Sequence, residues 1–201
     1  MRVPRVYVEV PLAAGSEIAL PEPAANHVAR VLRLAPGERL RLFDGRGADY
    51  DATLVQVDRR GARCAVGEAL SAAPESARPL ELVQGVSRGE RMDYTLQKAV
   101  ELGVTALRPV LTRRTTVRLD AERTQTRMRH WHGVVVAACE QCGRARLPDL
   151  APVADFAAGV AAAAAGLRLV LRADAPEALA ALAAPPRGVT LLIGPEGGLA
   201  P

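Results

Sequence analysis

The sequence predicts an α/β protein in which a domain with a parallel sheet follows a smaller domain built mainly of β-strands. Residues 1–70 carry short stretches in which apolar and polar residues alternate with a period of two, as in half-buried strands. After residue 79, apolar runs without alternation take turns with helical patterns, which is typical of a parallel sheet with helical crossovers. Residues 71–79 are mostly small or polar and include two prolines, as in a linker. We therefore expect one domain at residues 1–72 and a second at residues 73–201.

The smaller domain is expected to be a barrel-like or sandwich module with one helix. Its strand candidates are residues 3–10, 39–43, 50–57 and 63–66. The sequence Asp-Gly-Arg-Gly at residues 44–47 predicts a turn between two of them. Residues 24–33 have helical spacing instead, and Pro36-Gly37 follows as a stop signal.

The second domain is expected to alternate strands with helices. The strand candidates are residues 80–86, 104–111, 167–171 and 189–193. The helix candidates are residues 91–102, 126–142, 157–165 and 176–183. The last two strands lack alternation, so we expect both to be buried in a parallel sheet.

The composition is that of a globular protein with a mild excess of positive charge. Of the 201 residues, 26 are basic and 22 acidic, which gives a net charge of +4 and a pI near 9.4. Residues 74–150 alone contribute +4, since they hold 13 basic and 9 acidic residues. A basic surface of this kind fits an RNA or phosphate partner.

The chain shows no membrane span, signal peptide or disulfide framework. No apolar run reaches the roughly 18–20 residues that a transmembrane helix needs, and three cysteines in a chain without a secretion signal indicate a reducing cytoplasm. Cys139 and Cys142 have CxxC spacing, which alone is weak evidence for zinc. We expect them to be structural or incidental cysteines, and we expect no metal.

A glycine-rich segment, Gly194-Pro-Glu-Gly-Gly198, directly follows the last predicted strand. Ligands in open α/β sheets lie beyond the carboxyl ends of the strands, and glycine lets the backbone approach a ligand closely. The segment matches neither a dinucleotide fingerprint nor a P-loop. It is therefore either a structural turn or a ligand loop.

Three further segments carry charge in places where it could serve chemistry. Residues 87–94 form a basic turn before a helix, which suits either a phosphate or a solvated helix start. The arginines of residues 113–129 could contact phosphates or form a solvated face. Glu140 opposes the dipole of its helix near the C-terminus, so it needs a partner such as Arg144 or a substrate.

Five segments together carry a family resemblance that spans the whole chain. They are residues 26–33 (NHVARVLR), 42–45 (LFDG), 91–103 (RMDYTLQKAVELG), 138–144 (ACEQCGR) and 193–198 (IGPEGG). Their order and spacing resemble those of the RsmE family, the bacterial 16S rRNA uridine-N3 methyltransferases of the SPOUT superfamily.

The resemblance implies a fold and a function. It implies a PUA-like RNA-binding domain followed by a SPOUT domain, which forms a trefoil knot in the full-length family and binds S-adenosyl-L-methionine. It further implies a cytoplasmic homodimer that methylates N3 of a uridine in 16S rRNA of the small ribosomal subunit. The target nitrogen is itself the nucleophile, so the transfer is a direct displacement that needs an accessible, unpaired or flipped-out base.

The resemblance also implies roles for individual residues. The cofactor-binding positions are Leu171, Gly194, Pro195, Glu196, Gly197 and Gly198. The RNA-binding positions are Arg5, Asn26, His27, Arg30, Arg33, Arg88 and Arg91. Glu140 and Arg144 are the candidates for the catalytic step.

The chain departs from the family pattern at its C-terminus. Family members continue after the glycine-rich loop with the segments that complete the knot, whereas this chain ends at Pro201. We therefore expect a truncated second domain that lacks the last knot loop and helix. The alternative function is that of a catalytically incompetent RNA-binding fragment, and a different nucleotide-binding enzyme is disfavoured because the usual phosphate-binding motifs are missing.

Overall fold

The protein is described by a computed structural model that covers residues 3–71, 74–116, 120–163, 166–172, 174–183 and 187–200. The chain divides into two compact units. Unit 1 comprises Met1–Glu75 together with Cys139–Leu147, and unit 2 comprises Ser76–Ala138 together with Pro148–Pro201. The sequence analysis divided the chain at residue 72 into an RNA-binding domain and a catalytic domain. This assignment of function to the two domains stays a prediction.

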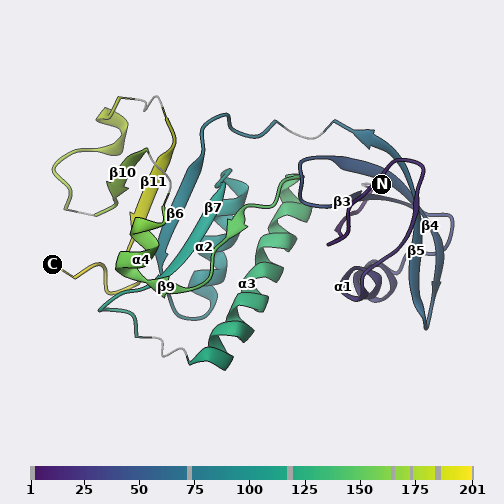
Figure 1. Ribbon diagram of the computed structural model, residues 1–201, viewed down its shortest axis with the longest axis horizontal. Coiled ribbons are helices and arrows are strands. Elements are labelled where there is room, and N and C mark those ends of the chain that lie inside the picture. The colour runs from purple at the N-terminus through teal and green to yellow at the C-terminus, as the bar shows by residue number, and fades with distance from the viewer. Residues whose placement is uncertain are drawn as a thin grey trace. The chain divides into compact units, whose positions relative to one another are not determined.

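Unit 1 is built on one five-stranded sheet with the order β1-β3-β4-β5-β2. Figure 1 labels the three neighbouring strands β3, β4 and β5. Its strands are β1 (Arg5–Tyr7), β2 (Glu17–Ala19), β3 (Arg39–Phe43), β4 (Asp49–Asp58) and β5 (Gly61–Leu70). Strand β1 pairs with β3 in parallel, and the remaining pairs are antiparallel. The alternation in the sequence is realised as alternating burial, so that Leu40, Leu54 and Cys64 point into the core.

The helix of unit 1 differs from the single α-helix expected at residues 24–33. An α-helix, α1 (Glu22–Asn26), passes directly into a π-helix, η1 (His27–Leu32). Arg33 then ends the helix in the left-handed conformation, with φ of 55°. Val28, in the π-helix, is fully buried in the core of unit 1, so the π-helical segment packs against the sheet.

Unit 2 is built on a six-stranded sheet with the path β10-β11-β6-β7-β8, and β9 also pairs with β7. Its strands are β6 (Leu80–Gly85), β7 (Ala106–Leu111), β8 (Asp149–Leu150), β9 (Ala154–Asp155), β10 (Leu167–Val170) and β11 (Val189–Ile193). Every pair in this sheet is parallel, which confirms the α/β class with a parallel sheet. The short strands β2, β8 and β9 were not apparent from the sequence.

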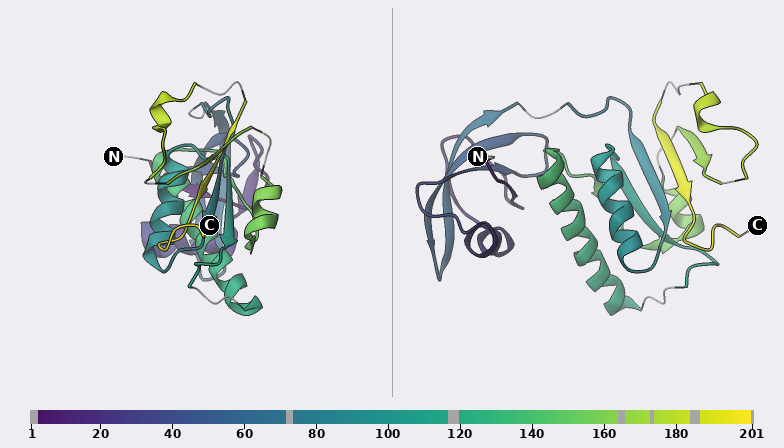
Figure 2. Two further views of the ribbon diagram at one scale, coloured as in Figure 1. Left: turned by 90° about the vertical axis from the view of Figure 1, so that its left-hand side faces the viewer. Right: turned by 180° about the vertical axis from the view of Figure 1, so that it is seen from behind.

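Helices cover both faces of this sheet. They are α2 (Glu90–Glu101), α3 (Ala121–Cys142) and α4 (Phe156–Ala161). Figure 2 shows α2 and α4 on opposite faces of the sheet. The chain steps from β6 to β7 in one direction and later returns to β10 in the other, and right-handed crossovers then place the two helices on opposite sides. Within the described ranges, no helix combines the length and apolar character needed to cross a membrane.

Two expectations for unit 2 were wrong. The helix expected at residues 176–183 is only a 3₁₀ turn, Leu179–Ala181. Its surroundings are exposed, and so short a helix is unstable without an apolar face to bury. Strand β10, expected to be buried, is mostly exposed because it lies at the edge of the sheet with one neighbouring strand.

Candidate functional site

The glycine-rich segment lies at the carboxyl end of β11, beside the carboxyl end of β6. Strand β11 pairs with β6 up to Ile193 and Gln84, so the two strands end side by side. A Cβ atom on Gly85 would lie 2.5 Å from Cδ of Pro195, and one on Gly194 would lie 2.6 Å from the carbonyl carbon of Gly198. These close approaches require glycine at both positions. The segment is therefore a compact loop that folds onto the end of β6.

Glu196 connects this loop to the basic turn that precedes α2. Its Oε1 atom accepts a 2.8 Å hydrogen bond from the backbone N–H of Arg88 and lies 3.7 Å from Nη1 of Arg91. The hydrogen bond from Arg88 is the main cause that lowers the pKa of Glu196, and the charges of Arg91 and Arg88 lower it further. The fold thus joins two motifs that are far apart in the sequence, and both contain expected site residues.

Two further side chains, those of Arg114 and Gln84, donate hydrogen bonds to the loop. Neither residue was expected at the site. Nη1 of Arg114 donates a 2.8 Å hydrogen bond to the carbonyl oxygen of Gly197. Nε2 of Gln84 donates to the carbonyl oxygens of Gly85 and Gly194, at 2.9 and 3.2 Å. Arg114 belongs to the arginine-rich stretch noted in the sequence, but nothing in that pattern distinguished it from its neighbours.

A cavity of about 690 Å³ opens beside the loop. It is lined by Arg114, Val170, Leu171, Arg172, Asp174, Gly194, Gly198, Leu199 and Ala200. The structure therefore brings together Leu171, Gly194 and Gly198, three of the positions that the family resemblance gives as cofactor-binding. The lining combines apolar side chains with backbone groups and a carboxylate, and such a mixture suits a small organic ligand.

Glu140 and Arg144 lie in unit 1, whereas the glycine-rich loop lies in unit 2. Oε1 of Glu140 accepts a 3.0 Å hydrogen bond from the backbone N–H of Tyr7 in β1. The guanidinium of Arg144 donates to both carboxylate oxygens of Glu75, at 3.1 and 2.7 Å. Arg144 is thus paired with Glu75, and the backbone of β1 supplies a partner for the carboxylate of Glu140.

Arg5 anchors the end of α3 within unit 1. Its guanidinium donates to both oxygens of Asp49, at 3.0 and 2.7 Å, and to the carbonyl oxygens of Cys139 and Arg144, at 2.6 and 3.2 Å. The side chains of Arg5 and Asp49 are each only 6% exposed. The negative end of the α3 dipole also stabilises a cation at this position. RNA contact by Arg5 is therefore the least supported of the expected RNA contacts.

The remaining expected RNA-binding residues are accessible or half-buried in their own units. Asn26, His27, Arg30 and Arg33 follow one another along α1 and η1 in unit 1. Arg88 and Arg91 flank the start of α2 in unit 2.

Two of the three cysteines are poor nucleophiles. Burial raises the pKa of Cys139 to about 12 and that of Cys64 to about 11, so both remain protonated at neutral pH and are weak nucleophiles. Cys142 is exposed, and all three cysteines are free. Among the residues that the structure describes, no three His, Cys, Asp or Glu side chains lie together as a metal ion would require.

Comparison with known proteins gives matches to both parts of the chain. The family model for the RNA methyltransferase domain matches residues 74–201, and that for the RNA methyltransferase PUA domain matches residues 20–66. Ribosomal RNA small subunit methyltransferase E of Mycobacterium tuberculosis is 31% identical over 97% of this chain and 76% of that protein. The same enzyme from Buchnera aphidicola is 24% identical over 74% of this chain and 61% of that protein.

Two solved structures resemble the whole fold. A methyltransferase from Legionella pneumophila in complex with bound S-adenosylmethionine (SAM) aligns with a TM-score of 0.93 and 34% identity, over 100% of this chain and 83% of that one. The methyltransferase E of Neisseria gonorrhoeae, also bound to SAM, aligns with a TM-score of 0.92 and 34% identity, over 99% and 82% of the two chains. The 31% identity to a methyltransferase E over 97% of this chain, together with the match of the RNA methyltransferase model to more than half of the chain, means that this chain belongs to the RsmE family of RNA methyltransferases.

Proposed function

We propose that this protein transfers a methyl group from S-adenosyl-L-methionine to N3 of a uridine in 16S rRNA of the small ribosomal subunit. The observation that carries the proposal is the loop Gly194–Gly198, which is held on the end of β6 by Glu196, Arg114 and Gln84 and borders a cavity. Two similar structures, those of the Legionella and Neisseria proteins, were solved with SAM bound. The alternative of an RNA-binding protein without catalysis is not favoured, because this loop and its cavity are already assembled.

The residues of the cavity fit such a cofactor. Val170 and Leu171 offer apolar surface for a flat base, and Gly194 and Gly198 expose backbone groups without side chains in the way. Asp174 offers carboxylate oxygens that accept hydrogen bonds from hydroxyl groups, and Arg172 holds it through two hydrogen bonds of 2.9 and 2.7 Å. When bound, the cofactor supplies the methyl group on a positively charged sulfur.

The protein has to orient the uridine and assist the loss of its N3 proton. Holding two reactants in the correct relative position removes a large part of the activation barrier of such a transfer. Arg88 and Arg91 carry positive charge beside the loop, where they can hold an RNA phosphate or polarise a uracil oxygen. Glu140 is our candidate for the carboxylate that accepts the proton, and Arg144 is the alternative candidate, as a cation that polarises the uracil. Contacts with Tyr7 and Glu75 hold the two side chains in defined positions.

RNA binding and methyl transfer are assigned to different domains, as in the family. We assign RNA holding to residues 1–72 and methyl transfer to residues 73–201. A homodimer and a cytoplasmic location, which the family resemblance implies, stay predictions. Light scattering on the purified chain measures the first of them.

The function is tested by incubating the purified protein with SAM and with small ribosomal subunits from a strain that lacks the modification. Mass spectrometry of the digested RNA nucleosides should then show N3-methyluridine. Reactions without cofactor, and reactions with large-subunit rRNA, serve as controls. Absence of the modified nucleoside, with the protein folded and the cofactor bound in calorimetry, would overturn the proposal.

A further inference from the structure

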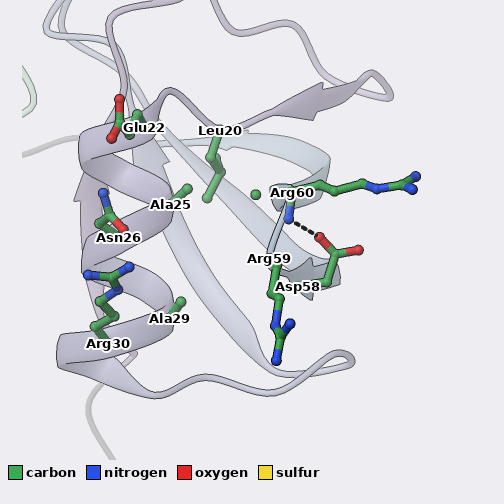
Figure 3. Close-up of a pocket in the computed structure, with 10 residues that line it drawn as sticks. Leu20, Glu22, Ala25, Asn26, Ala29, Arg30, Asp58, Arg59 and Arg60 are labelled. Carbon is green, nitrogen blue, oxygen red and sulfur yellow. Dashed lines mark hydrogen bonds between the residues drawn. The ribbon is translucent and has the colours of Figure 1, made fainter.

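Two cavities of the protein differ in how their charged side chains are arranged. One lies in unit 1, has a volume of about 500 Å³, and is bordered by α1, η1 and the turn that joins β4 to β5 (Figure 3). The carboxylates of Glu22 and Asp58 line it together with arginines, and Figure 3 shows the side chain of Arg60 pointing away from the helix. The charges of this cavity are mixed, so they indicate no single class of ligand.

The cavity beside the glycine-rich loop of unit 2 has a cation that no carboxylate neutralises. Its charged lining residues within the described ranges are Arg114, Arg172 and Asp174. Arg172 donates hydrogen bonds of 2.9 and 2.7 Å to the two carboxylate oxygens of Asp174, so these two charges offset each other. Among the residues that the structure describes, Arg114 has no carboxylate partner, and its guanidinium donates to the carbonyl oxygen of Gly197.

The guanidinium of Arg114 lies against the loop, at the edge of the cavity. Its Nη1 atom is 2.8 Å from the carbonyl oxygen of Gly197, and a Cβ atom on Gly198 would lie 3.8 Å from the same nitrogen. Gly198 lines the cavity without a side chain, so it does not cover the guanidinium. A guanidinium has five N–H donors, and Arg114 is exposed, so the donors that the loop does not use are accessible to a ligand.

The cofactor assigned to this cavity carries one anionic group. The sulfur and the amino group of SAM are positively charged, whereas its α-carboxylate is negative. A guanidinium binds a carboxylate through two parallel N–H···O bonds, a geometry that a point charge such as an ammonium group lacks. Arg114 is therefore the lining residue whose charge and shape match the carboxylate of the cofactor.

We propose that Arg114 binds the α-carboxylate of SAM and thereby selects ligands that carry an intact amino acid end. One part of the guanidinium is bound to the loop through Gly197, and the rest of its fork is directed to the ligand. The same side chain thus connects the loop to the cofactor. The inference rests on the proposed function, because it specifies how the cavity recognises the cofactor of the proposed reaction.

The first test compares two ligands that differ only in the carboxylate. Decarboxylated S-adenosylmethionine keeps the adenosine, the sulfonium and the amino group of SAM. Calorimetric titration with each ligand is carried out on the unaltered protein, on Arg114→Ala and on Arg113→Ala as the matched control. We expect Arg114→Ala to bind SAM roughly fivefold more weakly and the decarboxylated ligand at most about twofold more weakly, the latter because the loop loses a hydrogen bond. Arg113→Ala should bind both ligands like the unaltered protein.

The second test changes the charge and the shape of the side chain separately. Arg114→Lys keeps the charge and loses the fork, so it should retain only part of the preference for SAM. Arg114→Glu places a negative charge beside the carboxylate, so SAM should bind about a further fivefold more weakly than to Arg114→Ala. The decarboxylated ligand has no anionic group and should bind Arg114→Glu no more weakly than Arg114→Ala. Thermal melting without ligand checks that each variant is folded.

The outcomes separate this inference from the proposed function. Equal losses of affinity for the two ligands in Arg114→Ala would overturn the inference, because Arg114 would then act only by holding the loop. Unchanged SAM affinity in Arg114→Ala, with weaker binding of ribosomal RNA, would also overturn it and would assign Arg114 to an RNA phosphate. Failure of the unaltered protein to bind either ligand would instead count against the proposed function.

Discussion

The backbone N–H of Arg88 donates a 2.8 Å hydrogen bond to Oε1 of Glu196, and this contact joins segments separated by 108 residues. It links the turn before α2 to the loop after β11 in one structural unit. The contact therefore holds two segments that carry expected site residues next to each other.

Acid should weaken cofactor binding through Glu196. Its pKa in the folded protein lies below the ordinary 4.5, so the contribution of its carboxylate is complete above pH 4.5 and is lost as the pH falls through the lowered pKa. Calorimetric titration with SAM should show constant affinity above pH 4.5 and a decline below it. Glu196→Gln should lack this dependence, whereas Glu90→Gln, at an exposed position at the start of α2, should retain it. An identical decline in Glu196→Gln would contradict the assignment.

Loss of the Arg114 side chain should loosen the loop. Arg114→Ala removes the hydrogen bond to the carbonyl oxygen of Gly197. At an exposed position we expect a loss of about 1 kcal/mol in SAM binding, or roughly fivefold in affinity. Arg113→Ala is the matched control, because Arg113 is also exposed and is not in the cavity lining. Equal affinities for the two variants would show that Arg114 does not position the loop.

A methyl group at Gly85 should displace the loop. The Cβ atom of Gly85→Ala would lie within 2.6 Å of both Cδ and the backbone nitrogen of Pro195, and backbone cannot move aside cheaply. We expect the free energy of unfolding to fall by about 1–3 kcal/mol and SAM binding to be lost. Gly133→Ala, on α3 with open space around it, should be neutral or stabilise the protein by up to about 1 kcal/mol. Unimpaired cofactor binding by Gly85→Ala would refute the close approach of the loop to β6.

Arg5 should contribute to the stability of the folded protein. Arg5→Ala leaves Asp49 charged and buried, so we expect the free energy of unfolding in urea to fall by about 3–5 kcal/mol. Arg39→Ala breaks an exposed ion pair with Asp51 and should change it by less than about 1 kcal/mol. If Arg5→Ala instead kept its stability and lost only RNA affinity, the expectation from the sequence would be correct after all.

Glu140→Gln should distinguish a catalytic from a structural carboxylate. The glutamine oxygen can still accept the hydrogen bond from the N–H of Tyr7, so we expect stability to change by less than about 1 kcal/mol. If Glu140 handles the N3 proton, the rate of methyl transfer should fall about a hundredfold or more. An unchanged rate would restrict Glu140 to holding the end of α3 against β1, and would favour Arg144 for the catalytic step.

The sequence by itself determined the class of fold and the family, and it indicated the glycine-rich loop of the candidate site. Alternation in β3 and β4, unalternating apolar runs in β6 and β11, and glycines at 194 and 198 are local properties, and local periodicity and backbone sterics decide them. The family resemblance, which is also read from the sequence, indicated Leu171 and Glu196 as cofactor-binding positions.

Only the tertiary structure decided which distant groups meet. Three contacts of this kind are the pairing of Arg144 with Glu75, the hydrogen bond to Glu140 from β1 and the hydrogen bond from Arg114 to the loop. The partners in these contacts are separated by 69, 133 and 83 positions in the sequence. Burial also lies outside local pattern: β10 has the composition of a core strand, yet its place at the sheet edge leaves it exposed. The cavity beside η1 has the same origin, because a π-helical turn and a β-turn line a common space only when the sheet brings them together.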